Sequence, residues 1–192
     1  MTMYANWGKR VFDVTLALLL ALPALVLCVF CVVAIRQESF GPGLFKQARV
    51  GRNRKLFTLY KLRTMSAGTG DRASHEVAAS QITRIGRILR RTKLDELPQL
   101  INVLKGDMSF VGPRPCLPNQ ESLIAERVSR DVFAIRPGIT GAAQLAGIDM
   151  STPTELSIVD ARYRSDINFR SDLAYIIGTA LGRGGGDAVK DG

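Results

Sequence analysis

Two adjacent carboxylates, Asp95 and Glu96, lie in the stretch RRTKLDELPQLINVLKGDMSFVGPRP at positions 90–115. Pro98 suits a first helical turn and Gly106 is a natural stop, so the sequence predicts a short helix that begins at this acidic pair. The free backbone N–H groups and the dipole at a helix start favour negative charge. The position therefore suits a carboxylate and would also help to neutralise a phosphate group brought beside it.

Basic side chains are the natural partners of such a phosphate. Arg114 lies between Pro113 and Pro115, so its backbone has few alternative conformations and its guanidinium is held in one place. A rigid Arg-Pro-Gly turn mounts Arg136 in the same way. Other candidates alternate on one face of a predicted strand or precede the acidic pair. The candidate phosphate contacts are therefore Lys61, Arg63, Arg90, Arg114 and Arg136.

A purely structural role for the acidic pair is the alternative, in which Asp95 caps the helix and Glu96 is solvated in its first turn. Apolar residues at helical spacing count against this alternative, because they would pack the helix on a core and fix its first turn. These residues are Leu94, Leu97, Leu100, Ile101 and Leu104.

Composition limits the classes of protein and partner. With 192 residues, of which 46% are hydrophobic, the chain can bury one core and form one domain with an appendage. A formal net charge of +9 favours acidic partners, such as nucleic acid, anionic lipid headgroups or a phosphorylated small molecule. The sequence shows none of the common nucleic-acid-binding motifs, so we expect no nucleic-acid partner.

Few side chains are available for histidine or cysteine chemistry. The single histidine, His75, lies in a polar segment, which argues against a Ser-His-Asp triad or a histidine-ligated metal. Cys28 and Cys31 form a C-x-x-C inside an apolar run without a second ligand pair, and Cys116 stands alone. We interpret all three as small apolar residues. Catalysis would therefore depend on carboxylates and basic groups.

The apolar run from Val11 to Ile35 predicts a membrane helix. Roughly 22 apolar residues would make a helix of about 33 Å, long enough to cross a bilayer. Pro23 lies in the middle of the run, where it removes a hydrogen bond and favours a sharp kink. Basic residues flank both ends, which draws both ends to the cytoplasm. Two arrangements remain open: a straight span, and a re-entrant helix kinked at Pro23.

The remaining elements are predicted from local patterns. Alternating character over 44–50 and 55–60 favours a β-hairpin that continues to Met65, and 66–80 is expected to be a flexible loop. The amphipathic basic helix expected from Ile82 to Arg91 could lie on an anionic membrane or be an ordinary surface helix. Further helices are predicted over 117–134, 153–164 and 172–181. The division is a membrane segment 1–36, a catalytic domain 37–181 and a disordered tail 182–192.

Several of these segments together resemble a known family. In order along the chain they are Lys9-Arg10-Val11-Phe12-Asp13, the apolar run with its proline, Lys61-Leu62-Arg63-Thr64-Met65, Leu94-Asp95-Glu96-Leu97-Pro98-Gln99-Leu100, Asn102-Val103-Leu104-Lys105-Gly106-Asp107-Met108-Ser109, Val111-Gly112-Pro113-Arg114-Pro115 and Arg136-Pro137-Gly138-Ile139-Thr140-Gly141. Over about residues 8–181 the chain resembles the monotopic phosphoglycosyl transferases. These bacterial sugar transferases begin glycan assembly on a polyprenol phosphate.

The resemblance implies a fold and a reaction. The fold would be α+β and mostly helical, with a re-entrant membrane helix and a small cytosolic domain of amphipathic helices and a β-hairpin. The reaction would move a sugar 1-phosphate from a UDP-sugar to undecaprenyl or another polyprenyl phosphate, with release of UMP. The protein would work at the cytosolic face of the bacterial inner membrane, in contact with anionic phospholipid, as the first membrane step of glycan assembly, for example of lipopolysaccharide. The oligomeric state stays open, with a homodimer as one option.

The resemblance also implies roles for the site residues. Asp95 would be the nucleophile that forms a covalent phosphosugar intermediate, and Glu96, with Asp95, would hold Mg²⁺. Arg90 and Arg114 would contact the substrate's phosphates. These roles agree with elementary chemistry, because attack on a diphosphate by a carboxylate needs a divalent cation and arginines to neutralise charge.

The sequence departs from the family pattern at two places, and two alternatives for the function remain. Leu22 replaces a serine common before the kinking proline, and Ala142-Ala143 replaces an aromatic position that could shape the sugar or nucleotide pocket. The short chain resembles the branch of the family associated with amino sugars, and this resemblance implies an N-acetylated amino sugar as substrate. The alternatives are a hexose 1-phosphate, galactose or glucose, and a non-catalytic basic membrane scaffold.

Overall fold

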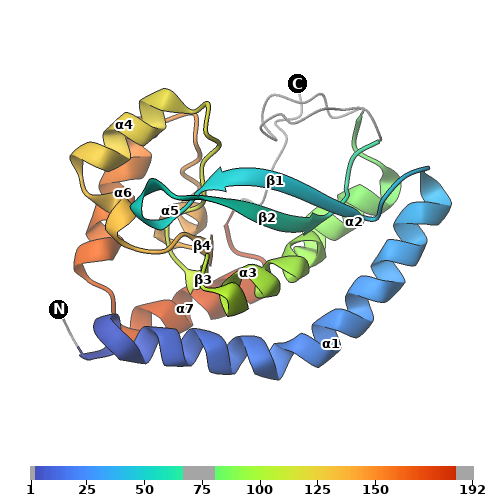
Figure 1. The fold of residues 1–192 in the computed structure, drawn as a ribbon, viewed down its shortest axis with the longest axis horizontal. Helices are drawn as coiled ribbons and strands as arrows, with labels where there is room; N and C mark the ends of the chain where they lie inside the picture. Colours follow the sequence, from blue (N-terminus) through green and yellow to red (C-terminus); the bar gives the residue numbers. More distant parts are fainter. Residues whose placement is uncertain (1–2, 67–80, 185–192) are drawn as a thin grey trace.

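A computed structural model of the chain describes residues 3–66 and 81–184 (Figure 1). The expected loop over 66–80 and the expected tail after Gly184 therefore lie almost wholly outside the described residues. The elements, in order, are a π-helical turn Tyr4–Gly8, α1 Lys9–Glu38, β1 Leu44–Val50, a 3-10 turn Arg52–Arg54, β2 Leu56–Leu62, α2 Arg84–Thr92, a 3-10 helix Leu94–Gln99, α3 Leu100–Lys105, β3 Ser109–Val111, α4 Glu121–Ser129, a 3-10 turn Val132–Ala134, β4 Gly138–Thr140, α5 Ala142–Leu145, α6 Pro153–Ser165 and α7 Phe169–Ala180. The mostly helical α+β class is confirmed.

Helix α1 is the one helix in the described part of the chain that is long and apolar enough to cross a membrane. Most of its large apolar side chains are exposed, including Leu19, Leu22 and Phe30. Pro23 lies halfway along, and the helix bends near its middle while remaining helical throughout (Figure 1). The apolar surface of α1 thus faces outward, as in a helix that contacts lipid rather than a protein core.

An ion pair and a hydrogen bond attach the N-terminal end of α1 to the folded domain. Lys9 Nζ lies 2.6 Å from Oδ2 of Asp172, on α7. Asp13, one helical turn after Lys9, is 1% exposed, and its Oδ1 accepts a hydrogen bond of 3.1 Å from the backbone N–H of Phe110. A carboxylate buried this deeply in an apolar helix is costly unless it is paired, so Asp13 fixes where α1 meets β3.

The C-terminal end of α1 is bonded to the same domain. Glu38 accepts hydrogen bonds from the first two backbone N–H groups of α2, at Arg84 (2.7 Å) and Ile85 (3.0 Å). Arg63, which follows β2, donates to the carbonyl oxygens of Ser39 (2.8 Å) and Phe40 (2.9 Å). Both ends of the apolar helix are therefore attached to one folded unit. In Figure 1, α1 runs along the bottom and one side of that unit.

The predicted hairpin is present. β1 and β2 pair antiparallel, from Leu44 opposite Leu62 to Val50 opposite Leu56. Asn102 of α3 is fully buried against its edge, where Nδ2 donates to the carbonyl of Thr58 (2.7 Å) and Oδ1 accepts from the N–H of Tyr60 (3.2 Å). This amide locks α3 to β2 and so sets the position of the acidic turn that precedes α3.

The Pro-Gly segment predicted as a rigid turn instead contains a strand. β3 and β4 form a short parallel pair, with Ser109 opposite Gly138 and Val111 opposite Thr140. Gly138 allows this approach, because a Cβ there would lie 2.1 Å from the backbone nitrogen of Gly112. The pair lies in the main core, with Met108, Val111 and Val103 buried around it.

Two other predictions need correction. Ile101 and Leu104, expected on the packed face of the central helix, are 47% and 37% exposed, because Asn102 and Val103 occupy the buried face instead. The helix expected over 117–134 is shorter, since α4 covers only Glu121–Ser129. The helices predicted over 153–164 and 172–181 are found as α6 and α7, with slightly different bounds.

Candidate active site

The acidic pair lies in a 3-10 helix, Leu94–Gln99, that leads directly into α3. Lys93 precedes it in the left-handed conformation (φ 58°), and this sharp change of direction separates the turn from α2. The side chain of Lys93 makes no capping hydrogen bond, and Asp95 lies inside the first turn rather than at the cap. Asp95 is 4% exposed, so the carboxylate is a buried element of the site and not a solvated helix acid.

Glu96 is the centre of a compact charged group. Its Oε1 accepts hydrogen bonds from Lys61 Nζ (3.2 Å) and from Nη1 and Nη2 of Arg114 (both 3.3 Å). The three side chains are 10–20% exposed, so these charges are held close together with little water between them. Two of the five predicted basic residues are thus brought to the predicted acid pair, from the hairpin and from the Pro-Arg-Pro segment.

The backbone around Arg114 is held by hydrogen bonds on both sides. The carbonyl of Pro113 accepts from Gly138 N (2.9 Å), and the carbonyl of Pro115 accepts from Arg49 Nη1 (2.9 Å). The carbonyl of Arg114 itself accepts from Arg127 Nη1 (2.8 Å). The backbone around Arg114, predicted to be rigid from its flanking prolines, is therefore held by a hydrogen bond at each carbonyl. The guanidinium of Arg114 needs little change of position to bind a substrate.

Arg127 is a supporting residue that the sequence did not single out. Its side chain is 2% exposed and pairs with Asp160 of α6, with Nε and Nη2 at 3.0 and 2.7 Å from Oδ2. Burial raises the pKa of Asp160, and the Arg127 guanidinium opposes that rise. The pair joins α4 to α6, and Arg127 also donates to the backbone carbonyl of Arg114. Its only sequence signal was an arginine in a predicted helix, 33 residues from its partner.

A hollow of about 250 Å³, open to solvent, lies beside Glu96 and Arg114. Lys93 lines it, and burial, together with the nearby Arg114 charge, lowers the pKa of this ammonium while Glu96 opposes the effect. Other lining residues come from β4, α5, the end of α7 and the chain after α7, namely Ile139, Thr140, Gln144, Leu145, Thr179, Arg183 and Gly184.

Two of the first residues of the expected tail 182–192, Arg183 and Gly184, line this hollow. Lys93 Nζ donates to the carbonyl of Arg183 (2.9 Å), and Arg183 N donates to the carbonyl of Gly178 (2.9 Å). A Cβ at Gly184 would lie 2.7 Å from the backbone oxygen of Gln144. The chain after α7 thus closes one wall of the hollow, where two basic residues, Lys93 and Arg183, lie together.

The other three predicted basic residues each donate a hydrogen bond to a different part of the chain. Arg90 Nε donates to Thr64 Oγ1 (2.9 Å), at the junction of α2 with the chain after β2. Arg63 holds the end of α1, as described above. Arg136 Nε donates to the carbonyl of Gly106 (2.8 Å), beyond the far end of α3. The structure gives neither Arg63 nor Arg136 a contact with Glu96.

The carboxylates of the acidic turn fit Mg²⁺ only if phosphate oxygens of a substrate complete the coordination of the ion. The described residues contain no group of three or more His, Cys, Asp or Glu side chains that could hold a metal by themselves. Among these residues no hydrogen bond occupies Oε2 of Glu96, which leaves one carboxylate oxygen for a cation. Mg²⁺ commonly takes one or two carboxylates and completes its shell with phosphate and water, so Glu96 and Asp95 fit such a site.

Comparison with known proteins identifies the family. The family described as bacterial sugar transferase matches residues 4–183. The chain belongs to this family. As a member of a sugar transferase family it is an enzyme of the transferase class.

Curated relatives of this transferase include proteins named for different sugars. It is 39% identical to the uncharacterized sugar transferase EpsL of Bacillus subtilis, over 86% of this chain and 81% of the relative. It is 41% identical to the UDP-glucose:undecaprenyl-phosphate glucose-1-phosphate transferase of Caulobacter vibrioides, over 84% and 61%. It is 36% identical to the UDP-N-acetylgalactosamine-undecaprenyl-phosphate N-acetylgalactosaminephosphotransferase of Aeromonas hydrophila, over 71% and 33%. The chain thus spans most of some relatives and a third of others.

Proposed function

We propose that this transferase moves a sugar 1-phosphate from a UDP-sugar to a polyprenyl phosphate such as undecaprenyl phosphate, with release of UMP. The observation that carries the proposal is the pairing of Glu96 with Lys61 and Arg114 next to the buried Asp95, beside a hollow lined by further basic residues. A diphosphate placed there would meet several cations at once. The named relatives that act on UDP-sugars and undecaprenyl phosphate support the same reaction.

The transfer would occur in two displacements at one phosphorus atom. A carboxylate oxygen of Asp95 attacks the phosphorus that bears the sugar, the bond from that phosphorus to the UMP oxygen breaks, and UMP leaves. A phosphate oxygen of the lipid then attacks the same phosphorus, the bond to Asp95 breaks, and the carboxylate is restored. Covalent catalysis of this kind lets one small site take a soluble donor first and a lipid acceptor second.

The charges of the site have separate tasks in this scheme. Arg114, on its fixed mount, would neutralise charge on the breaking phosphoanhydride, and Lys61 would keep Glu96 oriented. Lys93 and Arg183 line the same hollow and would meet the nucleotide phosphate. Glu96 and Asp95 would hold Mg²⁺, which supplies Lewis-acid neutralisation of the diphosphate when bound.

The attachment of α1 supports a re-entrant arrangement over a straight span. A helix that crosses the bilayer places its ends on opposite sides, about 30 Å of hydrocarbon apart. Here Asp13 and Glu38 both bond to the same domain, so both ends of α1 are on that domain's side of the membrane. We propose that this side is the cytosolic face of the bacterial inner membrane, where the catalytic domain would contact anionic phospholipid.

The sugar itself divides into two candidates. An N-acetylated amino sugar is the first, and the Aeromonas relative is named for one. A hexose is the second, and the 41% identity to the glucose-1-phosphate transferase of Caulobacter favours it. Ala142, the first residue of α5, stands where the resemblance implies an aromatic residue in many members, and it packs against the main core.

Intact-protein mass spectrometry tests the reaction and the nucleophile together. Detergent-purified enzyme is exposed briefly to Mg²⁺ and a panel of UDP-sugars without lipid, beside the Asp95→Asn variant. The expected result is a mass gain of one sugar phosphate in the wild type alone, with release of UMP. UMP release that requires polyprenyl phosphate, without any adduct, would replace the covalent route with direct transfer. No UMP with any donor, with or without lipid, would favour a non-catalytic scaffold.

A further inference from the structure

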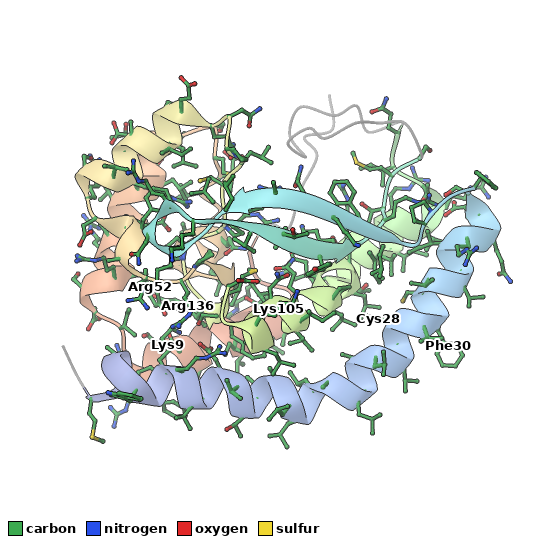
Figure 2. The ribbon with its side chains drawn as sticks, viewed as in Figure 1. Lys9, Cys28, Phe30, Arg52, Lys105 and Arg136 are labelled. Atoms are coloured by element: carbon green, nitrogen blue, oxygen red, sulfur yellow. The ribbon has the colours of Figure 1, made fainter. Side chains whose placement is uncertain are left out.

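Three arginines from distant parts of the chain lie together at the far end of α3 from the acidic turn. Arg10, on α1, donates from Nη1 to the carbonyl of Val103 (2.6 Å) and from Nη2 to that of Leu104 (3.1 Å). Arg136 donates from Nε to the carbonyl of Gly106 (2.8 Å). Figure 2 shows Arg136 next to Arg52, which lies in the turn between β1 and β2.

The charges of this cluster are poorly balanced by the protein. Burial lowers the pKa of Arg136, and the positive charges of Arg10 and Arg52 lower it further, because both lie close enough to repel the guanidinium of Arg136. Asp13 is the one carboxylate that opposes this effect, and it already accepts the N–H of Phe110. Among the described residues, no hydrogen bond or ion pair engages the side chain of Arg52 or the Nη atoms of Arg136. An anion would relieve the repulsion and satisfy these donors.

Two elements separate this cluster from the acidic turn. Arg136 lies four residues before Thr140, which lines the hollow beside Glu96, and four residues of extended chain span about 13 Å. Independently, the path from Glu96 to Gly106 runs through a 3-10 turn and all of α3, about 15 Å at helical rises. An anion at the three arginines would thus lie at the other end of this segment from the acidic turn, and it would be a second one.

The surroundings of the cluster indicate which kind of anion it would be. Val11, which follows Arg10 on α1, is 63% exposed, and Trp7, in the preceding π-helical turn, is 79% exposed. Leu104, whose carbonyl accepts from Arg10, is 37% exposed. The Arg10 guanidinium therefore lies at the border between the apolar surface of α1 and the polar domain. A lipid phosphate meets the same border from the other side, with acyl chains against apolar residues and the headgroup against cations.

We propose that Arg10, Arg52 and Arg136 form a binding site for the headgroup phosphate of an anionic phospholipid, separate from the catalytic hollow. The site would fix the depth and the tilt of the domain at the N-terminal end of α1, while the acceptor lipid is used at the acidic turn. This goes beyond the proposed reaction, because it requires neither Asp95 chemistry nor a particular sugar donor.

Native mass spectrometry of the full chain, released from nonionic detergent in the presence of phosphatidylglycerol, tests the site. Arg52→Gln removes one of the three charges without removing any hydrogen bond that the structure shows. Arg54→Gln removes a charge from the same turn and is the matched control, because Arg54 is not among the charges that act on Arg136. The wild type should retain one phosphatidylglycerol molecule, and Arg52→Gln should weaken its binding about fivefold, the effect of one basic residue at an anionic lipid surface.

Arg54→Gln should bind phosphatidylglycerol as the wild type does, and Arg136→Gln should bind it at least as weakly as Arg52→Gln. Equal binding by the Arg52 and Arg54 variants would overturn the proposal. A competition arm distinguishes the source of the phosphate: excess undecaprenyl phosphate should leave the phosphatidylglycerol bound. Displacement of phosphatidylglycerol by undecaprenyl phosphate would instead assign the three arginines to the acceptor lipid and refute a separate phospholipid site.

Discussion

The buried pair of Arg127 and Asp160 allows a quantitative test of how the catalytic arginine is supported. Asp160→Asn keeps the shape of the side chain but leaves the Arg127 guanidinium, 2% exposed, without a counter-charge. Leaving a buried charge unpaired costs about 3 kcal/mol at the low end of measured cases. At 1.36 kcal/mol per factor of ten, the population of opened molecules should rise roughly 100-fold.

Cys116 provides the assay for this variant. Its thiol is fully buried beside Arg127, and burial raises its pKa, so it reacts with an alkylating reagent only when the domain opens. With Cys28 and Cys31 replaced by alanine, Cys116 is the remaining thiol of the chain. Its labelling rate should rise roughly 100-fold in Asp160→Asn. Glu126→Gln, which removes an exposed ion pair on the same helix α4, should change the rate by less than about fivefold.

A labelling rate in Asp160→Asn no higher than in Glu126→Gln would refute the reasoning, because it would mean that Arg127 does not need its partner. A double variant then separates stability from positioning. Arg127→Met with Asp160→Leu should restore protection of Cys116, since an apolar pair of similar volume often replaces a buried ion pair without loss. It should nevertheless raise KM for the UDP-sugar, because the carbonyl of Arg114 has lost its donor. Wild-type KM in the double variant would show that Arg127 does not position Arg114.

Three further predictions follow from single contacts. Arg114→Lys, which loses the planar fork that holds Glu96, should lower kcat/KM for UMP release about 10- to 100-fold with little change in thermal stability. The Tyr163 hydroxyl donates to Asp172 (2.7 Å), and burial, with the Asp172 charge, raises the pKa of the phenol. The folded state therefore keeps this proton longer than the unfolded chain, so stability should fall as pH rises above about 10, and Tyr163→Phe should flatten that fall in Tm. Gly86→Ala should destabilise the protein by about 1–3 kcal/mol in thermal unfolding, because its Cβ would lie 2.0 Å from the carbonyl oxygen of Thr64 and would force α2 away from the chain after β2.

Each of these three has an outcome that would contradict it. Wild-type kcat/KM in Arg114→Lys would mean that a point charge suffices beside Glu96. An unchanged alkaline slope in Tyr163→Phe would assign the loss of stability to other groups, such as Tyr4, whose phenol also donates to Asp172. A Gly86→Ala protein as stable as the wild type would show that α2 can shift without cost to the core.

Local sequence patterns were sufficient to predict elements in which polar and apolar residues alternate or in which proline restricts the backbone. Alternation along 44–62 predicted the hairpin, and the prolines beside Arg114 predicted a rigid mount that the hydrogen bonds at Pro113 and Pro115 reinforce. The adjacent carboxylates were visible as a candidate site because they sit before a proline and an apolar stripe. Their roles in catalysis remain predictions, as do those of Mg²⁺ and of the lipid acceptor.

Contacts between distant residues could not be predicted from one sequence. The role of Asp13 in the apolar run was not visible in the sequence, because its partner, the N–H of Phe110, lies 97 residues away. β3 and β4 were missed because three residues each are too few to show alternation. Ile101 and Leu104 were placed on the buried face because hydrophobic periodicity cannot reveal that Asn102 takes that place to bind the edge of β2.

The attachment of α1 at both ends has a consequence for the order of events during synthesis. Lys9 is made before its partner Asp172, which follows 163 residues later. At common translation rates of 5–20 residues per second, that interval is roughly 10 to 30 s. In the re-entrant arrangement proposed above, the apolar helix would have to be kept during this time from aggregating and from inserting straight through the bilayer. The nascent chain would then need a membrane or a chaperone to hold α1 until the domain that binds both of its ends has been made.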